Sequence, residues 1–389
     1  MTTSHATPLV APLLSVFPMV KSVEIKNFRG LQDFRVEGLA SINLIVGDNA
    51  VGKTAFLEAI FLTLCGDASK ALILKQWRGQ DITIINGSVD SVVEGIYSDL
   101  FNDPKSPDPI SIKLTGDGFQ NRSLSIEKVV GETFYPTKEV GPKRNRHQRR
   151  AAAKTESLTL TPTSAEAVTV PISLTWTDAE GVAHLSRAAL SPAGLQFQGT
   201  GELIPNSQMF AAQVAIPAGE AADQFSALKK NRDAAPFEKI FLSVFDWIKE
   251  ISLGTVGNSP VLLADVPWAK QLLPLPALSG GTNRAASILL GLTKCRGGTV
   301  LVDEIESGIF HTRLRAFAQA TIEIARAYKS QIIMTSHSNE WISNFIDASG
   351  SNTADIALWR MERIDHGAPR MRRFSVEEFR EGQAMGDMR

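Results

Sequence analysis

The 389-residue chain is predicted to adopt an α/β fold, in which a mostly parallel, doubly wound sheet is interrupted by an antiparallel β lobe. Three observations predict this fold. Near both ends of the chain, short and continuously apolar runs alternate with stretches of helical period, as in parallel sheets that are covered on both faces. Between Asp81 and Gln198, short runs alternate apolar and polar residues and are separated by Gly, Pro, Asn and Asp. From Ala221 onward the helical period returns.

The first ordered part contains three predicted strands and one helix. Two of the strands alternate apolar and polar residues, as half-buried strands do, whereas the third is continuously apolar and is expected to lie inside a parallel sheet. In order they are VKSVEIKNF (20–28), LQDFRVEGL (31–39) and SINLIVG (41–47). A glycine-rich turn follows, and then a helix from Ala55 to Leu64 with an apolar face.

The inserted lobe is predicted to occupy residues 81–220 and to form an antiparallel sheet. Its expected strands are ISIKLTG (110–116), SLSIEKVV (123–130), SLTLTP (157–162), VTVPISLTW (168–176) and GLQFQG (194–199). Within the lobe, KRNRHQRRAAAK (143–154) is basic and has no apolar period. This run is either a solvated loop or helix, or a protrusion that binds a phosphate backbone or a partner. No aromatic residues interleave its charges, so stacking on single-stranded bases is not indicated.

The last third of the chain is expected to return to alternating helices and strands. The clearest amphipathic stretch is PFEKIFLSVFDWIKEI (236–251). Buried strands are expected at Thr299–Val302, Gln331–Thr335 and Ile356–Arg363, and helices at His311–Lys329 and over SVEEFREG (375–382).

Composition places few limits on function. Hydrophobic residues make up 43% and charged residues 21%, and 40 Lys+Arg against 41 Asp+Glu give a formal net charge of -1, which neither demands nor excludes nucleic acid. Cys65 and Cys295 lie in apolar helical patterns and are interpreted as core residues in a reducing compartment.

No run of apolar residues is long enough to span a bilayer. Residues 1–19 are apolar in part but lack a basic leader, so a flexible extension, a single domain over 20–389 and a cytoplasmic location are expected.

A phosphate-binding loop is predicted between the third strand and its helix. The sequence GDNAVGKT (47–54) matches G-x-x-x-x-G-K-[ST] and stands directly after a buried strand, at the start of a helix. Its glycines allow backbone N–H groups to face phosphate oxygens, and the helix N-terminus adds its positive end. Lys53 is placed to neutralise the β- and γ-phosphates of ATP, and Thr54 to ligate Mg²⁺. The full set of predicted loop contacts is Gly47, Asn49, Ala50, Val51, Gly52, Lys53 and Thr54.

Polar groups also follow two of the later elements. The buried strand TVLV is followed by Asp303, predicted to hold Mg²⁺, and Glu304, predicted to polarise the attacking water. His337 follows the next buried strand, at the sheet edge where ligands usually bind, and can contact the γ-phosphate. The turn Ser279-Gly280-Gly281 opens a helix and forms a second predicted anion site, which makes sense if it serves a neighbouring subunit's nucleotide.

In this order the motifs resemble those of an ABC-type ATPase. GDNAVGKT is similar to the Walker A motif, LSGG (278–281) to the signature, VLVDE (300–304) to Walker B, ESGIFH (306–311) to the D-loop region and TSH (335–337) to the switch histidine. The opening KSVEIKNFRGL (21–31) resembles RecF, SMC-type and OLD-family ATPases, in which the residue matching Arg29 lies near the nucleotide. The resemblance implies that ATP is held between Walker A of one protomer and the signature of another. Gln76 is one candidate for the Q-loop glutamine.

The resemblance implies two alternative functions. DEIESGIFH (303–311) looks like the phrase in stand-alone ATPases of bacterial defence operons, and the first expectation is an ATPase switch for a separate effector, as in two-gene anti-phage systems such as PARIS. About fifty residues follow His337, too few for the TOPRIM nuclease of OLD proteins, so the nuclease is expected to be a separate protein. The second is a RecF-like repair ATPase that clamps DNA. A homodimer or higher homo-oligomer is expected in both, and a nucleotide-bound scaffold without turnover is disfavoured by Glu304.

Overall fold

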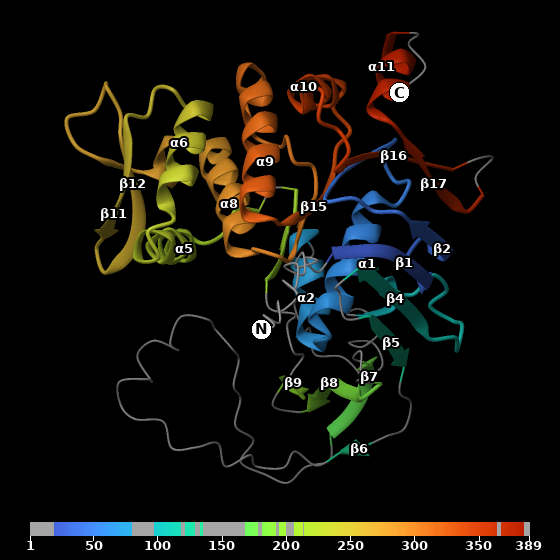
Figure 1. Ribbon diagram of the computed structural model, residues 1–389. Helices are drawn as coiled ribbons and strands as arrows, with labels where there is room; N and C mark the ends of the chain where they lie inside the picture. Colours follow the sequence, from blue (N-terminus) through green and yellow to red (C-terminus); the bar gives the residue numbers. More distant parts are fainter. Residues whose placement is uncertain are drawn as a thin grey trace, which may run out of the picture.

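The computed structural model describes residues 19–79, 97–117, 121–128, 133–134, 168–177, 181–191, 194–199, 206–212, 214–363 and 367–384. Within them the strands form three sheets, of eight, six and three strands. The antiparallel sheet and the helix-covered parallel sheet lie side by side, and a small hairpin stands at the far end (Figure 1). The expected α/β fold with a mostly parallel core sheet is confirmed.

The six-stranded sheet is the core of the fold, with the strand order β10-β14-β15-β3-β16-β17. Every neighbouring pair is parallel except β16 and β17, which form an antiparallel hairpin at one edge. The strands are β3 (Ile42–Val46), β10 (Ser207–Phe210), β14 (Thr299–Val302), β15 (Gln331–Thr335), β16 (Ile356–Arg363) and β17 (Pro369–Phe374). The two edge strands, β10 and β17, were not predicted, whereas the bounds of β14, β15 and β16 are as expected.

The parallel strands are continuously apolar because both faces of the sheet are buried. Along β3, Ile42, Leu44 and Val46 pack into one hydrophobic core, whereas Ile45 packs into the other. The same alternation divides β14, where Val300 points to the first core and Leu301 to the second. Burial on both faces therefore explains why these strands show no polar alternation.

The eight-stranded antiparallel sheet covers more of the chain than the predicted lobe. Its order is β2-β1-β4-β5-β7-β8-β9, with β6 beside β7. The strands are β1 (Met19–Phe28), β2 (Leu31–Glu37), β4 (Ile110–Asp117), β5 (Arg122–Lys128), β6 (Thr133–Phe134), β7 (Val168–Thr177), β8 (Ala183–Ser191) and β9 (Gly194–Gln198). Because β1 pairs along its length with β4, the first two strands belong to this sheet. The segments SLTLTP and 143–154, and residues 1–18, lie outside the described residues.

The predicted helix over residues 236–251 is only partly correct. Helix α6 (Ala234–Val244) ends before Phe245, whose φ of -121° and ψ of 71° are not helical, and residues 250–251 open strand β11 (Glu250–Val256). A turn that includes Gly257, with φ of 58°, joins β11 to β12 (Ser259–Asp265), and β13 (Leu273–Pro274) completes this three-stranded sheet. The glycine can adopt the left-handed conformation of a tight hairpin, so strand pairing overrides the helical period.

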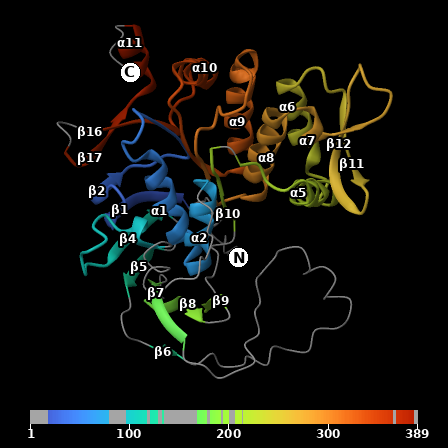
Figure 2. The same cartoon turned by 180° about the vertical axis from the view of Figure 1, so that it is seen from behind.

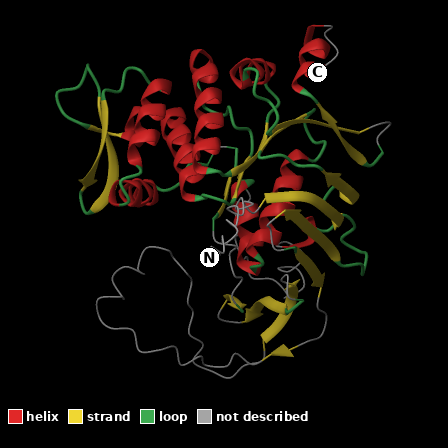
Figure 3. Ribbon diagram, viewed as in Figure 1, coloured by secondary structure: helices red, strands yellow, loops and turns green. Residues whose placement is uncertain are grey.

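Helices cover the two faces of the parallel sheet. Helix α1 (Lys53–Cys65) packs between this sheet and the antiparallel sheet, and α2 (Ala68–Trp77) lies beside it (Figure 2). The opposite face is covered by the helices of the second half of the chain (Figure 3). These helices are α5 (Ala218–Lys230), α6, α7 (Leu275–Leu278), α8 (Gly280–Lys294), α9 (Leu314–Tyr328) after a short 3₁₀ turn at His311–Arg313, α10 (Asn339–Ser349) and α11 (Val376–Ala384).

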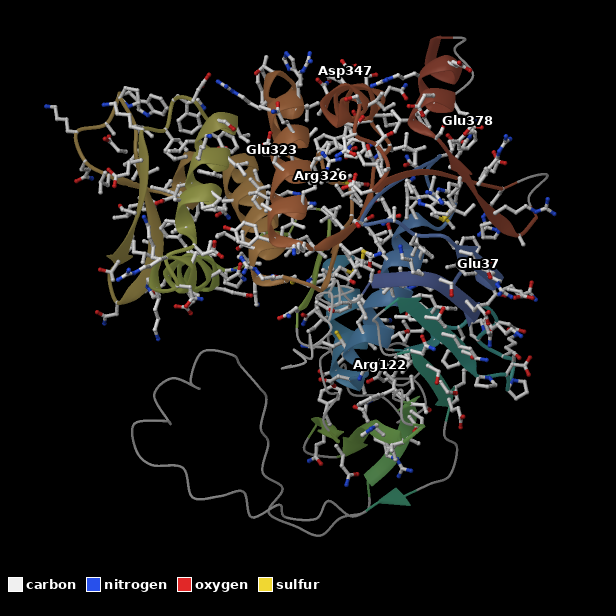
Figure 4. The ribbon with its side chains drawn as sticks, viewed as in Figure 1. Glu37, Arg122, Glu323, Arg326, Asp347 and Glu378 are labelled. Carbon is white, nitrogen blue, oxygen red and sulfur yellow. The ribbon has the colours of Figure 1, made fainter. Side chains whose placement is uncertain are left out.

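Charged side chains join the layers away from the sheet edge that carries the predicted site. Arg122 of β5 donates to the Leu64 carbonyl oxygen at 2.7 Å and its guanidinium lies 3.8 Å from the centroid of the Trp176 ring, whereas Arg326 of α9 pairs with Asp355 at 2.8 Å (Figure 4). No helix in the described part of the chain is both long enough and apolar enough to cross a bilayer.

Candidate functional site

The loop between β3 and α1 has a backbone that only glycine permits at two positions. Gly47 has a φ of 145° and Gly52 a φ of 117°. A Cβ atom on Gly47 would lie 2.1 Å from the carbonyl oxygen of Met361 in β16, so a larger residue would displace that strand. Ala50 also has a positive φ, of 62°. The loop is thus wound tightly against the sheet, as a phosphate cradle requires.

Lys53 is the first residue of α1, and its ammonium group lies back on the loop. Its Nζ donates to the carbonyl oxygens of Gly47 at 2.6 Å and Asp48 at 2.8 Å. Burial lowers the pKa of Lys53, and the acidic neighbours Asp303 and Glu304 partly oppose that effect. A buried ammonium held by neutral carbonyl groups gains strongly from a phosphate anion. Its position therefore fits the predicted phosphate contact.

Thr54 and Asp303 meet although they are separated by most of the chain. The hydroxyl of Thr54 donates to the two carboxylate oxygens of Asp303, at 3.1 and 2.9 Å. Thr335, at the end of β15, donates to Asp303 Oδ1 at 2.7 Å. A hydroxyl beside a carboxylate is the oxygen donor set that Mg²⁺ prefers. The residues present therefore fit a Mg²⁺ ion bound beside the phosphate loop.

Glu304 follows Asp303 directly and has a left-handed backbone, with φ of 46°. Its N–H donates to the Thr335 hydroxyl oxygen at 2.9 Å, which helps to hold this uncommon conformation. The side chain is 36% exposed, and its Oε1 lies 3.7 Å from His337 Nδ1. The turn thus directs Asp303 and Glu304 to different places, with Glu304 accessible to water and close to the predicted switch histidine.

Arg284 fixes the backbone of this acidic turn from the opposite side. It lies on α8, is only 4% exposed, and donates to the carbonyl oxygens of Ala211, Val214, Asp303 and Glu304 at 2.6, 3.0, 2.7 and 3.2 Å. Burial lowers its pKa to about 10, although nearby acids raise it. The helix that begins at the signature therefore carries the residue that holds both carbonyl groups of the acid pair.

The signature residues open α8 and, in the described part of the chain, make no hydrogen bond to the phosphate loop. The Ser279 hydroxyl accepts from the N–H of Thr282 at 2.9 Å and caps the helix. A Cβ atom on Gly281 would lie 1.9 Å from the Gly308 carbonyl oxygen, whereas one on Gly280 would meet nothing within 4 Å. Within the described residues, no hydrogen bond joins 279–281 to 47–54. The signature thus packs on the D-loop region and leaves Gly280 open.

Arg29, predicted to lie near the nucleotide, and Gln76, a candidate for the Q-loop glutamine, lie on elements other than the phosphate loop. Arg29 has a φ of 48° and is buried, with Nε 2.9 Å from Glu58 Oε2 and Nη1 3.1 Å from Asp99 Oδ2. Burial lowers the pKa of Arg29, with Glu58 as the largest opposing influence. Because Glu58 lies one turn beyond Thr54 on α1, Arg29 lies near the loop through that helix. Gln76 is exposed near the end of α2.

The sequence reasoning did not assign roles to Thr335, Arg284 or Glu306. Arg284 carried a detectable signal, because it is a charged residue within an otherwise apolar helical stretch. Thr335 lies in the TSH motif and Glu306 in the ESGIFH motif. Their neighbours in the sequence do not reveal that the side chain of Thr335 bonds to Asp303 and that of Glu306 to Ser336. The N–H of Asp303 donates to the carbonyl oxygen of Phe210 at 2.8 Å. Phe210 ends β10, a strand that was not predicted from the sequence.

Family profiles match two segments of the chain. An AAA domain profile matches residues 22–181, which include the phosphate loop. A second profile, described as AAA domain, putative AbiEii toxin, Type IV TA system, matches residues 224–343, which include the signature, the acid pair and His337.

Individual relatives point to the same class. An ATP/GTP phosphatase of Helicobacter pylori is 23% identical over 352 residues, which cover 83% of this chain and 86% of that protein. RecF of Lactococcus lactis is 37% identical over 102 residues, which cover 25% of each chain. Septu protein PtuA of Bacillus mycoides is 27% identical over 109 residues, covering 26% of this chain and 14% of PtuA.

Among solved structures, an SMC head bound to the C-winged helix domain of ScpA aligns with a TM-score of 0.47 and 14% identity, covering 94% of this chain and 100% of that one. The assignment to the AAA-type ATPases rests on the family profiles and the sequence relatives. The chain thus contains AAA-type ATPase domain sequence around both parts of the site, and part of it is similar to RecF.

Proposed function

We propose that this protein is a Mg²⁺-dependent ATP hydrolase that closes composite ATP sites between copies of itself and thereby controls a separate effector. The observation that carries the proposal is the contact of Thr54 with Asp303, at 2.9 Å, beside the Lys53 ammonium. This contact unites the phosphate loop with the acidic strand end. It creates a place where a triphosphate and a metal ion can be bound together.

Each residue then has a defined role in hydrolysis. Lys53 exchanges its loop carbonyl partners for phosphate oxygens. Thr54 and Asp303 would hold Mg²⁺, and the ion would screen phosphate charge. Glu304 orients the attacking water and accepts its proton, because its carboxylate is partly exposed beside the site. His337 contacts the γ-phosphate with its Nε2, because its Nδ1 lies beside the two carboxylates.

The signature residues act on the nucleotide of a second copy. Gly280 is open to solvent and lies at the N-terminus of α8, where backbone N–H groups attract anions. The same end of the helix is not bonded to its own phosphate loop. A homodimer or higher homo-oligomer would complete each site with Ser279 and Gly281 from the neighbouring protomer.

The proposed effector is a separate nuclease, of the TOPRIM type, in anti-phage defence. The profile over 224–343 is described as a putative AbiEii toxin, and PtuA, a Septu protein, is similar over part of the chain. Closure of the composite sites would alter the surface that holds the nuclease, so ATP turnover would decide whether it is retained or released.

The test is purification of tagged protein from its native operon with ATP and Mg²⁺, comparing the parent with Glu304→Gln. The variant is expected to retain ATP, to lose turnover and to accumulate closed oligomers, because the amide cannot accept the proton. Mass determination should find a second, nuclease-like polypeptide. If Glu304→Gln hydrolyses ATP at the parental rate, the catalytic assignment is wrong, and if no partner co-purifies, the effector proposal fails.

A RecF-like DNA clamp is the second candidate, favoured by the match to RecF over 102 residues. It predicts that the purified oligomer retains DNA, with an affinity that falls steeply as salt rises. Neutralising Arg144, Arg146, Arg149 and Arg150, which lie outside the described residues, should reduce that salt dependence. DNA without a protein partner would favour this candidate over the effector switch.

A further inference from the structure

Glu306 lies where the turn after β14 meets the turn after β15. Its Oε1 accepts from the Ser336 hydroxyl at 2.8 Å and from the His337 N–H at 3.3 Å. Its own carbonyl oxygen accepts from the Ile309 N–H at 2.9 Å, which fixes the turn that carries it. The carboxylate therefore links the acidic turn to the histidine turn through the side chain of a single residue.

The second oxygen of the same carboxylate is buried without a bond. Glu306 Oε2 has no hydrogen-bond partner among the described residues, and the side chain is only 11% exposed. A buried carboxylate oxygen that lacks a donor costs free energy, so the group gains when a donor approaches. The imidazole of His337 lies beside the same carboxylate, with its Nδ1 3.8 Å from the other oxygen, Oε1.

His337 stands between two carboxylates at nearly equal distances. Its Nδ1 lies 3.7 Å from Glu304 Oε1 and 3.8 Å from Glu306 Oε1. Both distances exceed a hydrogen bond, but a small rotation of the ring would bring either oxygen within range. The single Nδ1 proton can serve one carboxylate at a time. If it bonded to Glu304, that carboxylate would be less available to orient water.

We propose that Glu306 is the positioning residue for His337, taking the Nδ1 proton as its hydrogen-bond partner and leaving Glu304 free to bind the attacking water. Burial decides between the two acceptors. Glu304 is 36% exposed and can bond to solvent, whereas Glu306 is 11% exposed and has little access to water. The histidine proton therefore stabilises Glu306 more than Glu304.

This inference rests on the proposed ATPase function and predicts non-additivity. Glu306→Gln keeps the size and one acceptor oxygen but removes the charge beside the imidazole. It should lower kcat about tenfold, less than loss of a proton-transfer group itself, because the group acts through His337. The affinity for ATP should stay within about twofold, since loop contacts supply the binding. In a His337→Ala background, the same substitution should leave kcat unchanged.

The experiment measures kcat, KM and ATP affinity for the parent, Glu306→Gln, His337→Ala and the double variant. Glu340→Gln is the matched control, because it removes the same charge from an exposed position at the start of α10. Thermal melting checks the fold. Glu306→Asp, which keeps the charge but shortens the side chain, is a second substitution to combine with His337→Ala in the same double-mutant cycle.

A loss of the same size with and without His337 overturns the inference, because Glu306 would then act independently of the histidine. An unchanged kcat in Glu306→Gln overturns it as well. A parent enzyme without ATP turnover refutes the proposed function itself, and this inference with it. An active parent with additive variants refutes the inference alone.

Discussion

Replacing Arg284 with methionine tests whether the acid pair depends on a buried guanidinium. The change keeps a long, flexible side chain but removes the donors to four carbonyl oxygens, two of them on Asp303 and Glu304. The left-handed turn at Glu304 then loses its support from α8. The protein should therefore be less stable, and the carboxylate that we propose as catalytic should be displaced.

The size of the effect follows from two opposing contributions. A hydrogen bond from a charged donor contributes about 1.5–3 kcal/mol, and four such bonds converge here. Burial of the guanidinium, which lowers the pKa of Arg284 to about 10, offsets several kcal/mol of that gain. A buried acceptor left without its donor costs about 1–3 kcal/mol, and because four carbonyl oxygens lose theirs, we expect a net loss of about 3–5 kcal/mol for Arg284→Met.

Denaturant unfolding measures the loss, and steady-state ATP turnover measures the displacement of the acid pair. Arg284→Lys is the control, since it keeps the charge but lacks the planar fork, and it should lose less stability than the methionine variant. We expect kcat of Arg284→Met to fall at least about tenfold in protein that is still folded. A free energy of unfolding within about 0.5 kcal/mol of the parent would refute the reasoning.

Two further predictions concern the phosphate loop and the signature. Lys53→Ala should abolish nucleotide binding in titrations with a fluorescent ATP analogue, because the charge that faces the phosphates is lost, and retained binding at the parental affinity would contradict the assignment. Gly281→Ala should lower the melting temperature and impair oligomer closure, because its Cβ would lie 1.9 Å from the Gly308 carbonyl oxygen. Gly280→Ala, which meets no atom within 4 Å, should leave the melting temperature near that of the parent, and equal effects of the two would show that packing is not the cause.

Local chemistry made part of the site predictable. The phosphate loop could be predicted because its glycines, lysine and threonine all lie in one short segment between a strand and a helix. The strands β14, β15 and β16 were bounded correctly, because burial on both faces leaves a continuous apolar run with polar residues at its end. The order of the motifs then pointed to the ATPase class.

Long-range pairing was beyond the same reasoning. Strand β1 alternates like any half-buried strand, and nothing in it reveals that its partner is β4 rather than a strand of the core sheet. The helical period over 236–251 concealed the start of β11, because pairing with β12 overrode it. In both cases the deciding hydrogen bonds come from residues that lie elsewhere in the chain.

By itself, the sequence predicted which residues bind phosphate, hold a metal ion and polarise water, because those abilities belong to side-chain types in short motifs. Only the tertiary structure decided how they are held. Thr54 reaches Asp303 across 249 positions, and Glu306 reaches Ser336 across 30. Arg284 binds carbonyl oxygens on two different segments. Such contacts depend on where the folded sheet brings its strand ends together, and no local pattern encodes that meeting.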